Sequence, residues 1–214
     1  MTALRPPEFW IVAGPNGAGK TTCVQKEPIS NLLPAVRFLN PDDFTLTKLR
    51  ATGYAGFADA PVDVQAKLFV ESADEVLAET QAGIAAGEPV GVETVLSSSK
   101  YRPLVEEVRA ADGFVGLIYV ALSSPIIARE RVATRVRRGG HGVPDEKVDQ
   151  RWRRSLDCLG WFAERATAFW VVDNSDSDPS RPPELVAAGK TGSLEFLSER
   201  AFPELRAALG GLPR

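Results

Sequence analysis

The feature that most constrains this chain is a glycine-rich segment close to its beginning, GPNGAGKT over residues 14–21. It matches the pattern G-x-x-x-x-G-K-[ST] at every fixed position. The apolar run FWIVAG before it is typical of a β-strand, and the segment after it can form a helix. A strand, a glycine-rich turn and a helix in this order form a P-loop, whose backbone N–H groups surround a phosphate. The sequence therefore predicts a nucleotide site.

Two side chains of the loop carry their own chemistry. Lys20 is expected to reach the β- and γ-phosphates, and the Thr21 hydroxyl to hold Mg²⁺. We expect ATP and Mg²⁺ to be bound by the loop as a whole, namely Gly14, Pro15, Asn16, Gly17, Ala18, Gly19, Lys20, Thr21 and Thr22. The motif does not assign a reaction, because kinases, GTPases, motors and regulatory ATPases share it.

Short apolar runs separated by helical segments predict an α/β fold. The predicted strands are 8–13, 36–40, 89–93, 114–121 and 169–173. The clearest helix is 62–86, with apolar residues recurring every three or four positions and Gly87 as its cap. This alternation predicts one domain over 1–214, a three-layer fold in which a parallel five-stranded sheet carries helices on both faces. We expect a helical tail at about 190–214.

The net charge and the lengths of the apolar runs limit the kinds of partner that we expect for this protein. The 214 residues carry a net charge of −3, which argues against a nucleic-acid partner. The first ten residues lack the apolar core of a signal peptide, and no apolar run reaches the length of a membrane span. We therefore expect a cytoplasmic protein with a small-molecule substrate and without a membrane or nucleic-acid partner.

Polar side chains follow the second and third predicted strands, at the edge where a parallel sheet gathers its functional groups. In the sequence NPDDF, one of Asp42 and Asp43 could enter the site while the other caps the next helix. Glu93 and Thr94 end the third strand and are expected to face the same crevice, although Glu93 could instead be a capping or sheet-edge group.

The fifth predicted strand ends in Asp173 and Asn174. Its sequence FWVVD is similar to a Walker B strand, which makes Asp173 a rival magnesium ligand. We favour the other interpretation, in which the end of this strand, with Asn174, forms a wall of the adenine site.

A basic segment over 129–154 stands out in this acidic chain. It holds nine Lys and Arg against four Asp and Glu, a charge of +5, which leaves −8 for the rest. On a helix Arg131, Arg135 and Arg138 share one stripe, which leads into the glycine-rich GGHGVP. A solvated helix face is one interpretation. We favour a mobile lid whose arginines neutralise a transferring phosphoryl group and whose His141 contacts a phosphate or base.

The ordered set of these motifs resembles the zeta-toxin-like P-loop kinases of bacteria. The resemblance covers about residues 8–176 and consists of GPNGAGKTT, NPDDF, the ET that ends the third strand, the arginine-rich lid with GGHGVP, and VVDNS. Zeta toxins phosphorylate the 3′-hydroxyl of the sugar in UDP-N-acetylglucosamine. The GGHGVP form is similar to the stand-alone chromosomal branch of the family.

The resemblance implies a P-loop kinase-like fold and roles for individual residues. Asp42 would be the general base that takes the proton of the substrate hydroxyl, and Glu93 and Thr94 would help to hold the substrate. Arg131 is the best match among the lid arginines. His141 stands where the toxins carry a second lid arginine.

We therefore expect an ATP- and Mg²⁺-dependent kinase that phosphorylates a hydroxyl of a small molecule, such as a nucleotide sugar. An antibiotic or nucleoside O-phosphotransferase is the second enzyme interpretation, and a non-catalytic ATP-binding sensor is a third. Asp42 and the arginine lid argue against the sensor, which needs neither. An antitoxin could be a partner, although nothing in the sequence indicates one.

Overall fold

Seven strands form one mixed sheet in the computed structural model, which describes residues 6–24, 36–178 and 181–214. The strand order is β2-β3-β1-β4-β5-β6-β7. The strands are β1 Glu8–Ala13, β2 Arg37–Leu39, β3 Val90–Thr94, β4 Phe114–Ala121, β5 Ala168–Asp173, β6 Glu184–Lys190 and β7 Ser193–Leu197. β1 and β4 lie in the middle, and their near-continuous apolar runs are buried, as expected of parallel strands covered on both faces.

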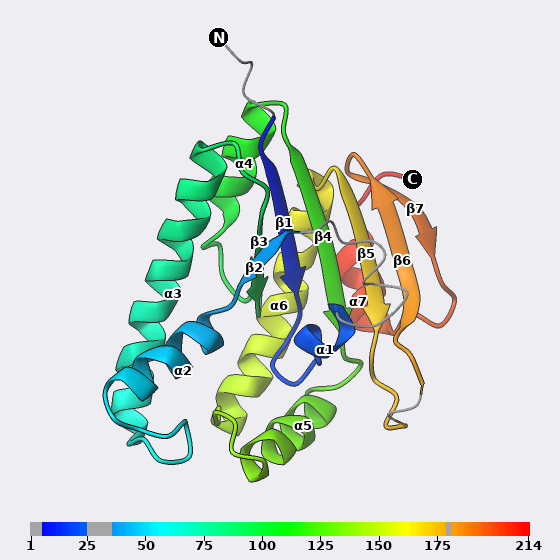
Figure 1. Ribbon diagram of the computed structural model, residues 1–214. Helices are drawn as coiled ribbons and strands as arrows, with labels where there is room; N and C mark the ends of the chain where they lie inside the picture. Colours follow the sequence, from blue (N-terminus) through cyan, green and yellow to red (C-terminus); the bar gives the residue numbers. More distant parts are fainter. Residues whose placement is uncertain (1–5, 25–35, 179–180) are drawn as a thin grey trace.

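Helices surround the sheet (Figure 1). They are α1 Lys20–Val24, α2 Pro41–Ala51, α3 Val62–Ala85, α4 Arg102–Ala110, α5 Pro125–Arg137, α6 Asp145–Arg165 and α7 Pro203–Leu209. In the view of Figure 1, α6 and α7 lie behind the sheet, α1 lies in front of it, and α3 runs beside β3 with α2 packed against it. None of the described helices is long and apolar enough to cross a membrane.

The expected five strands are all present and pair in parallel, but the expected five-stranded sheet is wrong because two more strands follow. β6 pairs antiparallel with β5, and β7 with β6. The expected helical tail is accordingly a β-hairpin followed by the short α7. The turn of this hairpin is Thr191-Gly192, with φ of 47° and 78°. Two successive positive φ values characterise the type I′ turn that joins two antiparallel strands.

Local caps position the helices that begin at the carboxyl edge of the sheet. Asn40 caps α2, because its side chain accepts a hydrogen bond from the N–H of Asp42 at 2.9 Å, and Pro41 opens the helix. Ser124 caps α5 in the same way, with Pro125 as the first helical residue. Both helices thus begin where parallel strands end, and they bring their first turns to the same edge.

Candidate active site

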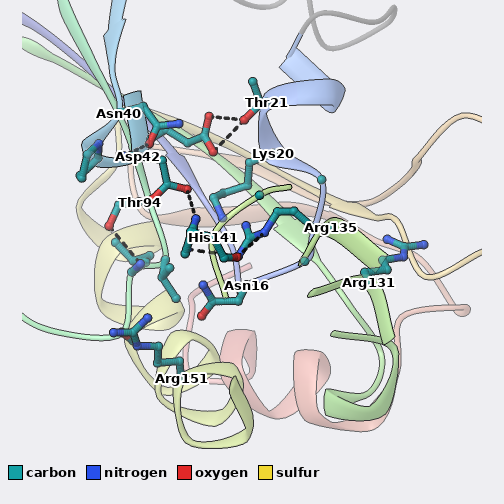
Figure 2. Close-up of a pocket in the computed structure, with 18 of the residues that line it drawn as sticks. Asn16, Lys20, Thr21, Asn40, Asp42, Thr94, Arg131, Arg135, His141 and Arg151 are labelled. Atoms are coloured by element: carbon teal, nitrogen blue, oxygen red, sulfur yellow. Dashed lines mark hydrogen bonds and ion pairs between the residues drawn. The ribbon is translucent and has the colours of Figure 1, made fainter. Parts of the chain in front are cut away.

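A cavity of about 880 Å³ opens at the carboxyl ends of β1 and β3 (Figure 2). Its lining comes from the P-loop, the first turn of α2, the middle of α3, the loop after β3, α5, the loop that follows α5, the second turn of α6 and the loop after β5. Of the residues expected to form a site, the cavity lining includes Asn16, Gly17, Gly19, Lys20, Thr21, Thr22, Asp42, Glu93, Thr94, Arg131, Arg135, Arg138 and His141. The fold therefore brings residues from distant parts of the sequence to one place.

The P-loop is held by close contact with its surroundings. At Gly14, where φ is 143°, a Cβ would lie 2.2 Å from the carbonyl oxygen of Val120 in β4. At Gly17, where φ is 75°, a Cβ would lie 2.7 Å from the carbonyl oxygen of Ala128 in α5. Only glycine fits these positions, because both the backbone conformation and the available space exclude a side chain. The loop is thus fixed between β4 and α5.

Lys20 points into the loop. Its Nζ donates to the carbonyl oxygens of Gly14, at 3.0 Å, and Pro15, at 3.3 Å. Burial lowers the pKa of Lys20, while the nearby carboxylates of Glu93 and Asp42 oppose this shift. An ammonium group held mainly by neutral carbonyls is ready to exchange them for the stronger contact with a phosphate.

Thr21 and Glu93 form the part of the site that fits a cation. The Thr21 hydroxyl lies 2.8 and 3.0 Å from the two carboxylate oxygens of Glu93. Burial raises the pKa of Glu93, and Lys20 and the Thr21 hydrogen bond oppose the shift. Hydroxyl and carboxylate oxygens are the hard ligands that Mg²⁺ prefers, with nucleotide phosphates completing the shell. The described residues contain no cluster of three or more His, Cys, Asp or Glu suited to a metal, so a cation here would depend on those phosphates.

The two aspartates of NPDDF lie differently. Asp42 lines the cavity, whereas Asp43 is exposed and does not. Neither caps α2, and the expectation that one of them would do so is wrong, because Asn40 is the cap. Burial together with the charge of Asp42 raises the pKa of Asp43. The structure thus offers one carboxylate of this pair to a ligand.

A chain of polar contacts joins the loop after α5 to Asp42. The Nη2 of Arg135 lies 3.2 Å from the Nε2 of His141, and the Nδ1 of His141 lies 3.3 Å from the Oδ2 of Asp42. Since a guanidinium can only donate, Nε2 accepts and Nδ1 carries the proton that His141 donates to Asp42. Burial lowers the pKa of His141, which agrees with this neutral form. The imidazole also packs between Phe57 and Phe69, with ring centroids at 5.3 and 6.0 Å.

The three arginines expected on one stripe of a helix have different surroundings. Arg135 lies in the centre of the cavity, and its Nε also donates to the carbonyl oxygen of His141 at 3.2 Å (Figure 2). Arg131 lies farther from Asp42 and donates to the carbonyl oxygen of Asp176 at 2.8 Å. Arg138 follows the last residue of α5 as its cap and is exposed at the rim. Arg135 is therefore the arginine best placed to meet a ligand at Asp42.

The residues at the end of β5 support the P-loop from the side. The Nδ2 of Asn174 donates to the carbonyl oxygen of Ala18 at 2.8 Å, so Asn174 holds the loop without itself lining the cavity. The carboxylate of Asp173 accepts from the backbone N–H and the hydroxyl of Ser175 and lies outside the cavity lining. Glu93, and not Asp173, is thus the acidic residue beside Thr21.

Two further features of the cavity were not expected from the sequence. The Oδ1 of Asn16, a residue of the cavity lining, is buried and has no hydrogen-bond partner among the described residues. Arg151, in the second turn of α6, also lines the cavity. Its membership of the basic segment was visible in the sequence, but the residue spacing did not distinguish it from its neighbours Arg153 and Arg154, which are exposed.

Comparison with known proteins gives matches in structure but not in sequence. No protein-family model matches the chain, and no curated protein matches it. A crystal structure of AvrRxo1-ORF1:ORF2 with ATP matches with a TM-score of 0.66 and 15% identity over 90% of this chain. This chain spans 61% of the length of that one.

Two other solved structures are similar. One is a proposed kinase from Chloroflexus aurantiacus, with a TM-score of 0.56 and 17% identity over 83% of this chain and 93% of the other. The second is from the PezAT chromosomal toxin–antitoxin system of Streptococcus pneumoniae, with a TM-score of 0.54 and 12% identity over 81% of this chain and 70% of the other. The chain therefore has a P-loop kinase fold, and its resemblance to the zeta-toxin-like kinases is confirmed at the level of the fold.

Proposed function

We propose that the protein is a phosphotransferase that moves the γ-phosphoryl group of ATP to a hydroxyl of a small molecule. The observation that carries this proposal is the presence of Asp42 in the same cavity as Lys20 and the Thr21–Glu93 pair. A nucleotide-binding sensor needs the phosphate side of this cavity but has no use for a carboxylate opposite it. A kinase needs both, because the acceptor hydroxyl must lose a proton while its oxygen attacks the phosphorus.

In the proposed reaction the P-loop holds the nucleotide phosphates and Lys20 neutralises the β- and γ-phosphates. Mg²⁺, held by Thr21 and Glu93 together with the phosphates, would supply further charge neutralisation. Asp42 accepts the proton of the acceptor hydroxyl as the new bond from oxygen to the γ-phosphorus forms. The bond between that phosphorus and the β–γ bridging oxygen breaks, and ADP leaves with the electron pair. Glu93, which the sequence suggested as a substrate ligand, is in this proposal a ligand of the metal.

Arg135 and His141 are proposed to complete the machinery from the lid side. Arg135 is close enough to Lys20 and Asp42 for their charges to influence one another, so its guanidinium can meet the equatorial oxygens of the phosphoryl group. His141 donates to Asp42 and orients the carboxylate toward the acceptor. Arg131, Arg138 and Thr94 are proposed to contact the substrates at the edges of the cavity, with Arg131 released from Asp176 when the lid closes.

A nucleotide sugar is the acceptor class that the zeta-toxin resemblance supports, and UDP-N-acetylglucosamine is the compound to test first. An antibiotic or a nucleoside remains the alternative acceptor, because the cavity also has an apolar wall formed by Phe69, Leu96 and Tyr101. PezAT is described as a toxin–antitoxin system, and from that likeness we propose an antitoxin as a partner to look for.

The test is conversion of ATP to ADP with a metabolite extract, followed by mass spectrometry for products heavier by one phosphoryl group. We expect such a product with the wild-type protein and none with Lys20→Ala. Lys48→Ala is the matched control, since Lys48 lies on α2 in an ion pair with Glu75 and outside the cavity lining. ATP binding without any phosphorylated product from extracts or from UDP-N-acetylglucosamine would favour the sensor.

A further inference from the structure

Arg151 is a cationic side chain without a described partner in the cavity. Its guanidinium makes no hydrogen bond or ion pair with any described residue, whereas Arg131 and Arg135 are both hydrogen-bonded to backbone carbonyls. Figure 2 shows Arg151 on α6 at the end of the cavity away from Thr21. No nitrogen of Arg151 is among the described buried side-chain atoms that lack a partner, so its N–H donors are open to the cavity and available to an anion.

The position of Arg151 is fixed by the residues that follow it in α6. The indole Nε1 of Trp152 donates to the carbonyl oxygen of Leu122 at 2.8 Å, and the Ser155 hydroxyl donates to the carbonyl oxygen of Val95 at 2.7 Å. These bonds attach α6 to the ends of β4 and β3. Arg151 therefore sits on an anchored helix, which fixes the position of its backbone at the cavity.

The location of Arg151 in the cavity points to the acceptor side, because it lies away from Thr21 (Figure 2). Burial lowers the pKa of Arg151, and the charge of Asp42 opposes this shift. For Arg135 the opposing charges are those of both Asp42 and Glu93, and Arg135 in turn acts on Lys20. Figure 2 shows Arg151 farther from Thr21 and Lys20 than Arg135 is. It lies where the acceptor, and not the nucleotide phosphates, is expected.

We propose that Arg151 forms an anion subsite for the acceptor, so that the substrate is a hydroxyl compound that carries its own phosphate or carboxylate group. This inference rests on the proposed function, because it takes the P-loop side of the cavity to be filled by ATP. A guanidinium fork binds either anion through two parallel hydrogen bonds. The hydroxyls of Ser97 and Ser98, which also line the cavity, are available as further donors, and Phe69 and Leu96 offer apolar surface for the rest of the molecule.

The first test measures binding of inorganic phosphate to protein saturated with Mg²⁺ and a non-hydrolysable ATP analogue. It compares wild type, Arg151→Gln and Arg154→Gln, the last being an exposed residue of the same helix outside the cavity lining. We expect wild type and Arg154→Gln to bind phosphate equally, and Arg151→Gln to bind it roughly tenfold or more weakly, the change that loss of a charged hydrogen bond brings. Equal binding by all three proteins, or no binding by wild type, would overturn the subsite.

The ATP analogue separates this inference from the proposed function. We expect its affinity to be the same in all three proteins. If Arg151→Gln lost affinity for the analogue, Arg151 would belong to the nucleotide site and the inference would be wrong, while the proposed function would stand. If wild type did not bind the analogue, the proposed function itself would fail.

A second test uses the analogue-loaded protein with three related ligands: glucose, glucuronate and glucose 1-phosphate. We expect wild type to bind one or both anions more tightly than glucose, and Arg151→Gln to lose this preference. The stronger of the two anions identifies phosphate or carboxylate as the group recognised. A wild-type protein that binds all three alike would contradict the proposal.

Discussion

The two walls of the cavity are built by different means. On the P-loop wall the backbone makes the site, and its shape is fixed by glycines that lie against β4 and α5. On the other wall, which meets the P-loop at α5, long side chains make the site, and they come from α5, the loop after it and α6. We infer a division of labour, in which the backbone wall formed by the P-loop holds the phosphate donor, and the side-chain wall surrounds the transferring group and the acceptor.

The largest loss of ATP binding is expected from a mutation in the backbone wall formed by the P-loop. Gly14→Ala places a Cβ against the carbonyl oxygen of Val120 in a conformation that alanine rarely adopts, so the loop must move. We expect ATP binding to be lost altogether, measured by titration with the non-hydrolysable analogue. Gly211→Ala is the control, because a Cβ there meets nothing within 4 Å. Normal ATP binding by Gly14→Ala would show that this wall is less rigid than its contacts indicate.

Asp42→Asn should keep ATP binding and lose phosphoryl transfer by about 10²- to 10⁴-fold, since an amide cannot accept the hydroxyl proton. Asp43→Asn serves as the control, because Asp43 is exposed beside it and does not line the cavity. Turnover and ATP affinity should be measured for both variants. Near-native turnover of Asp42→Asn would remove the general base from the mechanism.

The side-chain wall is expected to act on rate more than on ATP affinity. Arg135→Ala should lower turnover by about 10³-fold, the scale of arginine contributions in phosphoryl transfer, and Arg135→Lys should rescue poorly because lysine lacks the planar fork. Arg137→Ala, on the exposed side of the same helix, should be close to wild type. A change confined to the ATP dissociation constant would instead show that Arg135 serves to bind ATP.

The smallest effect concerns pH. The pKa of His141 is lowered from 6.5 by burial, with contributions from Arg135, Arg151 and Lys20, and Asp42 opposes the shift. Between the lowered pKa of the folded state and 6.5, the unfolded chain binds more protons than the folded chain. The free energy of unfolding that neutral His141 contributes is therefore fully present above pH 6.5 and is lost as the pH falls below that value. We expect denaturant unfolding from about pH 8 to 5 to show a steeper acid loss in wild type than in His141→Gln. Parallel curves would contradict the neutral Asp42–His141 contact.

The sequence predicts those structural features that depend on residues close together in the chain. The P-loop, the five parallel strands and α3 all follow from neighbouring residues. The cap of α3 is Ala86, and the expected Gly87 comes directly after it with a φ of 72°. The hairpin of β6 and β7 does not follow from the sequence in this way, because its turn, Thr191-Gly192, lies close to a proline-rich segment and the apolar residues after it also fit a helix. Thr-Gly between two apolar runs was the signal that could have found it.

Side-chain placement could not be read from the sequence in the same way. Glu93 lies beside Thr21 because β3 pairs with β1, with Glu93 opposite Val12, and that pairing is a long-range property. Arg151 enters the cavity because α6 is bonded to the ends of β3 and β4. In both cases the residue type was visible, and only the packing of elements distant in sequence decided what it faces.

The ends of the sheet have a consequence for association with other proteins. Within the described residues the outermost strands are β2, of three residues, and β7, of five. Each carries a charged side chain that engages in an ion pair, Arg37 with Glu79 and Glu195 with Lys190. Short, charged edges are poor templates for an added strand and discourage edge-to-edge aggregation. A partner protein is therefore expected to dock on helices or loops, and not to extend the sheet.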